Sequence, residues 1–235
     1  MLADKSILAV VPARGGSKGI KLKNLREVGG LSLVARTGKI IQQLPEIDAA
    51  VVSTDHELIA EEALRHGISA PFIRPPELSG DRIGDVEVLS HALLEAENAF
   101  SQTFDIVLML QPTSPLRKAD HVRQCLQKFC ESDVDATWTV SETDSKAHPL
   151  KQLKLNVSGG LELYDKEGSQ IIARQQLEPL YHRNGVAYAI SRECLINKKS
   201  ISGDKFNATV IDEYLANIDT EIDLKWADFL LSESQ

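Results

Sequence analysis

Short apolar runs of strand length alternate with longer segments of helical period along the first part of this chain. The apolar runs are Ile7–Val11, Ala49–Ser53, Ala70–Ile73, Asp105–Leu110 and Ala136–Val140. The segments between them space apolar residues three and four positions apart, which predicts helices over Leu33–Leu44, Leu58–His66, Val86–Ala99 and Ala119–Glu131. Strands that alternate with helices form parallel sheets covered on both faces. We therefore expect an α/β fold, a Rossmann-like and mostly parallel sheet flanked by helices.

The pattern changes after Val140. Two short alternating segments, Lys151–Asn156 and Leu161–Tyr164, are joined by Ser158-Gly159-Gly160, and this arrangement is typical of a β-hairpin. A hairpin of this kind does not continue the alternation of strands and helices. We expect residues 141–184 to form a protruding arm.

Core elements resume beyond the arm. Strands are expected at Gly185–Ser191 and Ala208–Ile211, followed by a helix from Glu221 to Leu231. A chain of 235 residues with 43% hydrophobic content is long enough for one large core. We expect a single domain over residues 1–235, with the arm inserted in it.

Charge and cysteine content narrow the partners and the compartment. The net charge of −8 argues against nucleic acid, which usually requires a basic face. The three cysteines, Cys125, Cys130 and Cys194, are odd in number and lack metal-ligand spacing, so we expect reduced thiols. Neither a signal peptide nor an apolar stretch of membrane-spanning length is apparent. These features favour a cytoplasmic protein that has no membrane partner.

The run from Val10 to Asn24 concentrates positive charge and glycine directly after the first apolar strand. Its cations are Arg14, Lys18, Lys21 and Lys23. Flexible backbone N–H groups and positive charge at the end of a strand favour the binding of a polyphosphate. A Walker A loop is excluded because Lys18 is followed by Gly19, and the dinucleotide pattern G-x-G-x-x-G is absent as well.

Three motifs resemble those of the acylneuraminate cytidylyltransferases, which activate sialic acids and related nine-carbon keto-sugars as CMP-sugars. Residues 12–24 match P-A-R-x-G-S-K-G-x-x-x-K-N, residues 74–81 match R-P-x-x-L-x-x-D, and residues 110–117 match L-Q-P-T-S-P-L-R. The resemblance extends from about Ile7 to Asp223. It implies a nucleotide-diphospho-sugar transferase type of fold in which the arm makes a homodimer.

The resemblance implies that CTP binds at the first two motifs. The expected nucleotide-binding residues are Ala13, Arg14, Gly15, Ser17, Lys23, Asn24, Arg74 and Asp81, of which Arg14 and Lys23 are also expected to be catalytic. For Lys18 and Lys21 the sequence does not distinguish between a role in binding the triphosphate and exposure to solvent. Asp55 follows the second strand and could approach the nucleotide, but Thr54 or Asp55 as the N-cap of the next helix is favoured.

For the sugar acid, the resemblance points to the third motif and to the arm. The expected sugar-binding residues are Gln111, Lys151, Arg174, Asn184 and Tyr188, and one or both of the arm cations reach across the dimer. Asn184-Gly185 also fits a tight turn before a strand. Arg117 is ambiguous, because it could simply pair with a neighbouring carboxylate such as Asp120. His182 is expected to line a pocket or the surface rather than to bind metal.

The segment from Asn217 to Asp223 carries the expected metal chemistry. Transfer from a nucleoside triphosphate normally needs Mg²⁺ anchored by one or two carboxylates, and Asp219 is the best catalytic and metal-binding candidate. Many members of the family have D-x-D here, whereas this chain has Asn217 in the first position. The amide oxygen of Asn217 can still bind Mg²⁺ or hold a water, but without the negative charge that a hard cation favours. Asp223 lies three residues after Thr220, which is the spacing of a capping box.

The sequence therefore predicts a CTP-dependent nucleotidyltransferase that acts on a nine-carbon 2-keto-3-deoxy acid of the sialic, legionaminic or pseudaminic type. It predicts N-acylneuraminate cytidylyltransferase chemistry with pyrophosphate as the second product. One alternative is the related cytidylyltransferase for the eight-carbon keto-sugar of lipopolysaccharide (CMP-Kdo type), whose first loop is closer to S-x-R-L-P-G-K. The other alternative is a non-catalytic nucleotide-binding homologue, for which Asn217 is the one indication.

Overall fold

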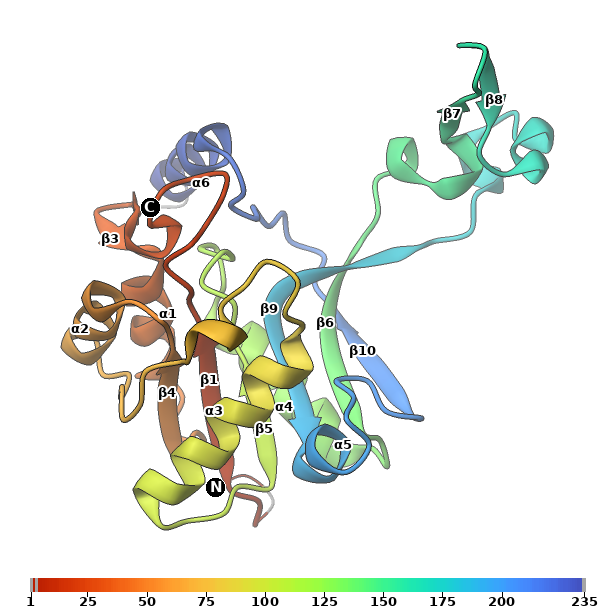
Figure 1. Cartoon of the computed structure of the whole chain (residues 1–235). Helices are drawn as coiled ribbons and strands as arrows, with labels where there is room; N and C mark the ends of the chain where they lie inside the picture. Colours follow the sequence, from red (N-terminus) through yellow and green to blue (C-terminus); the bar gives the residue numbers. More distant parts are fainter. Residues whose placement is uncertain (1, 3, 234–235) are drawn as a thin grey trace.

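A six-stranded sheet forms the centre of the molecule in the computed structural model, which describes residue 2 and residues 4–233 (Figure 1). Its strand order is β10-β6-β9-β5-β1-β4. The strands are β1 (Ile7–Pro12), β4 (Ala49–Ser53), β5 (Ile106–Met109), β6 (Ala136–Glu142), β9 (Tyr181–Ser191) and β10 (Phe206–Val210). Strand β1 pairs in parallel with β4 and β5, and β6 with β10, whereas β9 runs antiparallel to both β5 and β6. The expected mostly parallel sheet is confirmed.

Helices cover both faces of this sheet (Figure 1). They are α1 (Leu33–Ile41), α2 (Glu57–Arg65), α3 (Asp85–Phe100), α4 (Ala119–Glu131), α5 (Arg192–Ile196) and α6 (Glu221–Glu233). Short 3₁₀ turns occupy Lys23–Leu25, Pro76–Leu78, Ser145–Ala147, Pro149–Lys151, Lys166–Gln170 and Arg174–Gln176, and β2 (Glu27–Val28) pairs with β3 (Leu31–Ser32). Within the described part of the chain, no helix is both long and apolar enough to span a bilayer.

The alternation of side chains along β1 explains why the sheet has two covered faces. Ile7, Ala9 and Val11 are buried in one apolar cluster with α1 and α4, while Leu8 and Val10 are buried in another with α3. Successive side chains of a strand point to opposite faces, so a strand that is apolar at every position must be buried on both. The continuous apolar run at the start of the chain therefore specifies a central strand.

The strand expected at Ala70–Ile73 is not formed. Only Ser69 bridges to Val51 on the edge strand β4, and the chain then leaves the sheet as a loop. Pro71 has no N–H to donate to a ladder, and two further prolines at 75 and 76 stiffen the path away from the edge. The loop that carries Arg74 and Asp81 is therefore not preceded by a strand.

The arm projects away from the sheet and ends in the hairpin of β7 (Leu153–Leu155) and β8 (Leu161–Leu163) (Figure 1). Both hairpin strands are shorter than expected. Strand β6 continues to Glu142 and strand β9 already begins at Tyr181. The part of the arm outside the sheet is therefore shorter than residues 141–184. Asn184-Gly185 therefore lies inside a strand, at an irregularity in the β6–β9 register, rather than in a turn before one.

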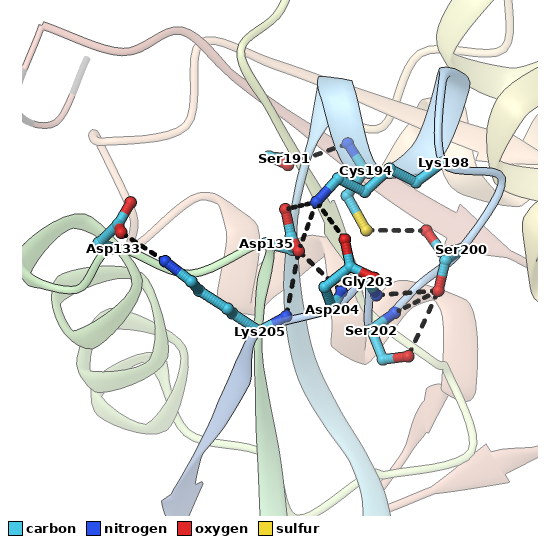
Figure 2. Close-up of polar contacts among 10 residues, drawn as sticks. All are labelled: Asp133, Asp135, Ser191, Cys194, Lys198, Ser200, Ser202, Gly203, Asp204 and Lys205. Carbon is cyan, nitrogen blue, oxygen red and sulfur yellow. Dashed lines mark hydrogen bonds and ion pairs between the residues drawn. The ribbon is translucent and has the colours of Figure 1, made fainter.

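Asp135 holds the loop that leads from α5 into the edge strand β10 (Figure 2). Its carboxylate accepts hydrogen bonds from Lys198 Nζ, at 2.9 Å to each oxygen, and from the backbone N–H of Asp204 at 2.8 Å and of Lys205 at 3.2 Å. Gly203 has a φ of +65° and would place a Cβ 2.4 Å from the Asp135 side chain. This cluster stabilises the connection between β9 and β10.

Candidate active site

A cavity of about 490 Å³ is lined by residues from four separate segments of the chain. They come from the glycine-rich run after β1, the loop from Arg74 to Asp85, the turn after β5, and the segment before α6. The predicted residues among them are Arg14, Ser17, Lys23, Asn24, Arg74, Asp81, Gln111, Asn217 and Asp219. Ligands of open α/β sheets bind outside the carboxyl ends of the strands. The cavity lies at the carboxyl ends of β1 and β5. The structure thus brings most of the expected nucleotide residues to one cavity.

The glycine-rich run is held in a folded loop by two buried polar contacts. Asn24 is buried, and its Nδ2 donates to the carbonyl oxygen of Arg14 at 3.0 Å. The N–H of Gly15 donates to Asp55 Oδ1 at 2.7 Å. Asp55 therefore stabilises the conformation of this loop. The expectation that Thr54 or Asp55 caps α2 is wrong: His56 occupies the N-cap position, and no side chain caps there.

Two cations of the run meet one carboxylate at the cavity. Arg14 Nη1 lies 2.8 Å and Lys18 Nζ 2.6 Å from the two oxygens of Asp81. Hydrogen bonds from Lys18 and Arg14 lower the pKa of this carboxyl, which therefore stays ionised. Lys18 lines the cavity, whereas Lys21 is exposed and does not line it. The structure thus separates two lysines that the sequence left equivalent.

Lys23 joins the glycine-rich run to the segment before α6. Its Nζ donates to the Ile218 carbonyl at 2.7 Å and to Asp219 Oδ1 at 3.0 Å. Asn217 Nδ2 donates to the other oxygen of Asp219 at 3.1 Å. The Ile218 N–H in turn donates to the Thr113 carbonyl at 3.0 Å. The carboxylate of Asp219 is therefore oriented by a cation and an amide at the cavity wall.

Asp223 has the structural role that its spacing predicts. Its Oδ2 accepts from the N–H groups of Asp219 at 3.0 Å and Thr220 at 2.7 Å, and from Thr220 Oγ1 at 2.9 Å. These are donors that the start of α6 would otherwise leave unpaired. The capping-box prediction is confirmed.

Arg74 lies deep in the cavity wall. Its guanidinium is buried and donates through Nη2 to the Ser53 carbonyl at 2.5 Å. Burial lowers its pKa from the ordinary value. Of the remaining predicted nucleotide residues, Ala13 is buried and its N–H donates to the Ser53 carbonyl at 2.9 Å. Neither Ala13 nor Gly15 lines the cavity. The backbone N–H of each residue donates a hydrogen bond to a neighbouring segment of the chain.

Arg117 is fully buried and makes no ion pair with Asp120, which instead pairs with Arg123. Its guanidinium donates to the carbonyls of Val186 at 2.6 Å and Gly185 at 3.0 Å, to the Gln111 carbonyl, and to Thr37 Oγ1 at 3.2 Å. Burial lowers its pKa to about 9. Arg117 therefore fixes the turn after β5 against strand β9.

Gly185 permits this contact between the turn and the strand. It has a φ of +73°, and an added Cβ would lie 2.6 Å from Gln111 Oε1 and 2.8 Å from Ser114 Oγ. A side chain here would be strained by both conformation and space. Ser114 Oγ also donates to the Asn184 carbonyl at 2.7 Å.

The other expected sugar residues are dispersed in a single copy of the chain. Tyr188 is buried in the core, and its hydroxyl accepts from the Gly185 N–H at 2.8 Å. The Asn184 side-chain amide accepts hydrogen bonds from Thr139 Oγ1 and the Val186 N–H and donates one to Ser141 Oγ. Lys151 is exposed on the arm and lines neither of the two cavities described here. Within one chain, only Gln111 from this set reaches the first cavity.

A second cavity, of about 990 Å³, lies between the base of the arm and the segment before α6. Arg174, His182, Arg183 and Asn184 line it from the arm side. His182 accordingly lines a pocket, as expected. Asn217 lines both cavities, so the two spaces meet at that residue.

The donor set at Asp219 is small for a metal. Among residues 2 and 4–233, no three His, Cys, Asp or Glu side chains gather as a metal-binding group. Asp219 has a largely exposed carboxylate at the first cavity, and Asn217 supplies an amide beside it. Mg²⁺ commonly takes only one or two carboxylates from a protein and completes its shell with water and phosphate oxygens. These residues fit a Mg²⁺ ion that is carried mainly by a triphosphate.

Comparisons with known proteins agree with this geometry. The sequence profile described as "Cytidylyltransferase" matches residues 8–227. The post-translational flagellin modification protein B of Campylobacter coli is 30% identical, with 97% of this chain and 95% of the relative covered. The CMP-N,N'-diacetyllegionaminic acid synthase of Legionella pneumophila is also 30% identical, with 94% and 93% covered. The N-acylneuraminate cytidylyltransferase of Streptococcus agalactiae serotype V is 31% identical, with 92% of this chain and 51% of the relative covered.

Solved structures show the same fold. The CMP:2-keto-3-deoxy-manno-octonic acid synthetase complexed with CTP superimposes with a TM-score of 0.73 at 16% identity, covering 98% of this chain and all of that one. The 4-diphosphocytidyl-2C-methyl-D-erythritol synthase of Anaerococcus prevotii gives a TM-score of 0.61 at 17% identity, covering 97% and 96%. The profile match over nearly the whole sequence shows that the chain belongs to the cytidylyltransferase family.

Proposed function

We propose that this enzyme joins CTP to a nine-carbon 2-keto-3-deoxy sugar acid and releases pyrophosphate. The anomeric hydroxyl oxygen of the sugar attacks the α-phosphorus of CTP. The bond between that phosphorus and the bridging oxygen breaks, the hydroxyl proton is lost, and the CMP-sugar and pyrophosphate are the products. The observation that carries the proposal is the convergence of Arg14, Lys18, Lys23 and Asp219 on one cavity. The names of the relatives at about 30% identity, a CMP-legionaminic acid synthase and an N-acylneuraminate cytidylyltransferase, support this choice of substrates.

The cations of the glycine-rich run are the groups that would bind the triphosphate. Arg14 and Lys18 share the carboxylate of Asp81, and all three side chains are partly or largely exposed. A phosphate oxygen can replace a carboxylate oxygen at Arg14 with little loss, because guanidinium binds both groups through two N–H donors. Positioning and charge stabilisation are sufficient for this class of reaction, which needs no covalent intermediate with the protein.

Lys23 and Asp219 would act together where the charge of the leaving pyrophosphate develops. Lys23 is largely buried, with 16% of its side chain exposed, so its charge is weakly screened. The carboxylate of Asp219, with Asn217 beside it, would hold Mg²⁺. When bound, this ion neutralises phosphate charge and orients the triphosphate.

The arm is the part of the molecule that we assign to a homodimer. Leu155 and Leu161 of its hairpin are 72% and 68% exposed, which leaves an apolar surface without cover in a single copy of the chain. A second copy would cover it and could place Lys151 or Arg174 near the sugar acid. The substrates are metabolites of the cytoplasm, which is the compartment we propose for this enzyme.

Pyrophosphate release tests the reaction. The purified chain is incubated with CTP, Mg²⁺ and N-acetylneuraminic, N,N'-diacetyllegionaminic or pseudaminic acid, with the eight-carbon acid 2-keto-3-deoxy-manno-octonate included because a structural neighbour is named for it. We expect turnover with at least one nine-carbon acid, and mass spectrometry of the product identifies it. Turnover with the eight-carbon acid alone would favour that alternative. Absence of turnover with every acid would contradict the proposed enzyme.

A variant pair links the activity to the cavity. Asp219→Ala should lower kcat by about a hundredfold or more, because a single charge-stabilising group in such sites commonly contributes that much. The control is Asp133→Ala, which removes an exposed carboxylate that pairs with Lys205 and lines neither described cavity. An Asp219→Ala enzyme with the activity of the control would remove Asp219 from the reaction.

A further inference from the structure

Arg183 occupies a position between the two cavities that the proposed reaction does not yet use. It lies on β9 at the base of the arm and lines the second cavity, while its ion-pair partner Asp85, the first residue of α3, lines the first. The Nη2 of Arg183 lies 2.8 Å from Asp85 Oδ2. The pair therefore stands where a sugar in one cavity would approach a nucleotide in the other.

The guanidinium of Arg183 lies within cation–π distance of two aromatic rings. Its Cζ lies 5.1 Å from the ring centroid of Trp138 and 5.1 Å from that of Tyr188, and these two rings are themselves in contact at 5.6 Å. A cation–π contact of this kind attracts the cation to the ring face and restricts the positions of the guanidinium. The side chain remains 41% exposed and lines the second cavity, so a ligand there can reach it.

A sugar acid brings a carboxylate that needs a cationic partner. Lys151 lines neither described cavity, and Arg174 lines the second cavity from the arm, on a short 3₁₀ turn without an aromatic support. Arg183, in contrast, already binds a carboxylate in a partly exposed site. Exchange of Asp85 for the substrate carboxylate keeps Arg183 paired with an anion throughout.

On the basis of the function proposed above, we propose that Arg183 binds the carboxylate of the sugar acid and so selects acidic over neutral sugars. Asp85 holds the guanidinium in place until the substrate replaces it. The aromatic support of Trp138 and Tyr188 keeps the orientation of the guanidinium during the exchange.

The ratio of KM values for the acid and its neutral methyl ester is the direct measure of this role. The acid is whichever nine-carbon substrate turns over, and CTP is saturating. With the wild-type enzyme, we expect KM for the ester to exceed that for the acid by about tenfold to a hundredfold, the value of one charge-assisted hydrogen-bonded contact. In Arg183→Gln the ratio should fall to about one, with KM for CTP changed by less than about twofold. Arg183→Lys should keep a ratio above that of Arg183→Gln because it keeps the charge, but below that of the wild type because it loses the planar guanidinium.

Arg192→Gln is the matched control. Arg192 also pairs with a carboxylate, Glu97 at 2.8 Å, but lines neither described cavity, so its variant should keep the wild-type ratio. If Arg183→Gln is too slow for kinetics, calorimetric titration of acid and ester into the CDP-saturated protein gives the same comparison. An unchanged ratio in Arg183→Gln, or a loss of the ratio in Arg174→Gln instead, would overturn the assignment of Arg183. The wild-type reaction with CTP tests the proposed function separately.

Discussion

Gly19 packs directly against the backbone of Asp219, so closely that an added Cβ would lie 2.4 Å from the Asp219 carbonyl oxygen. Real Cβ atoms do not approach an oxygen to that distance, and neither backbone can yield without moving. The glycine-rich run and the segment before α6 are therefore in contact through this glycine. The separation between the glycine-rich run and Asp219, the candidate metal ligand, is therefore fixed.

The variant Gly19→Ala should displace Asp219 from the cavity. We expect kcat/KM for CTP to fall by about tenfold to a hundredfold, because displacements of about 1 Å have effects of that size on positioned groups. Gly16→Ala is the control, since nothing lies within 4 Å of a Cβ at Gly16. Steady-state kinetics of both variants give the comparison, and equal activities would show that the close packing does not matter for turnover.

Replacement of Asn217 by aspartate should strengthen metal binding. Asn217→Asp adds a negative charge next to Asp219, with which Asn217 now shares a hydrogen bond of 3.1 Å. Hard divalent cations favour carboxylate over amide ligands. The Mg²⁺ concentration at half-maximal activity should fall by about tenfold, or about 1.4 kcal/mol. A metal titration identical to that of the wild type would show that position 217 does not contact the ion.

Arg117 is expected to contribute strongly to stability. Arg117→Lys replaces a planar group that donates to three carbonyls and one hydroxyl by an ammonium that cannot reach all of them. Unpaired buried carbonyls cost about 1–3 kcal/mol each, so the free energy of unfolding should fall by about 2–4 kcal/mol. Urea unfolding measures this. The exposed Arg65, paired with Glu61 and Glu62, gives the control Arg65→Lys, for which a change below about 0.5 kcal/mol is expected.

The Asp135 cluster should make stability depend on pH in the acid range. Hydrogen bonds from Lys198, Lys205 and Asp204 lower the pKa of Asp135 from 3.8 to about 2. A carboxyl whose pKa is lower in the folded state contributes stability above its unfolded value and loses it as pH falls through the folded value. The Tm of Asp135→Asn should therefore lie below that of the wild type at pH 7, and the difference should shrink between about pH 4 and pH 2.

Asp133→Asn tests whether this effect belongs to the cluster. Asp133 pairs with Lys205 only through an exposed side chain, so its variant should show a much smaller difference at pH 7. Thermal unfolding at a series of pH values measures both variants. A constant difference between wild type and Asp135→Asn down to pH 2 would contradict the assigned pKa.

Local patterns were sufficient for most of the fold. The helix over Ala119–Glu131 and the strand over Ala49–Ser53 have the predicted bounds, because apolar period and turn residues act within a few positions. The strand expected at Ala70–Ile73 is not formed, because a strand needs backbone hydrogen bonds to a neighbouring strand and Pro71 has no N–H to donate. Strand β9 begins earlier than expected because the partner strand β6 extends its pairing outward.

In the candidate site, too, some residues could be predicted from the sequence, whereas contacts between distant segments could not. The resemblance predicts roles for Arg14 and Lys23, and the position of Asp219 near the end of the core predicts a metal ligand; all three side chains line one cavity. The contact of Asp55 with Gly15, the burial of Tyr188 and the four donations of Arg117 join residues far apart in the chain. Side-chain type and spacing carry no information about such contacts, because they depend on how β5, β6 and β9 are packed together.

The sequence alone predicts the alternation of strands and helices, and it contains the glycine-rich cationic run with its resemblance to the cytidylyltransferases. Those properties are local, since they follow from the residue types within one segment. Three relationships depend on the three-dimensional fold: Lys18 rather than Lys21 lines the cavity, Asn217 lines both cavities, and Arg183 lies near the Trp138 ring beside Asp85. These relationships arise where distant segments meet at one edge of the sheet, and no single segment specifies that meeting.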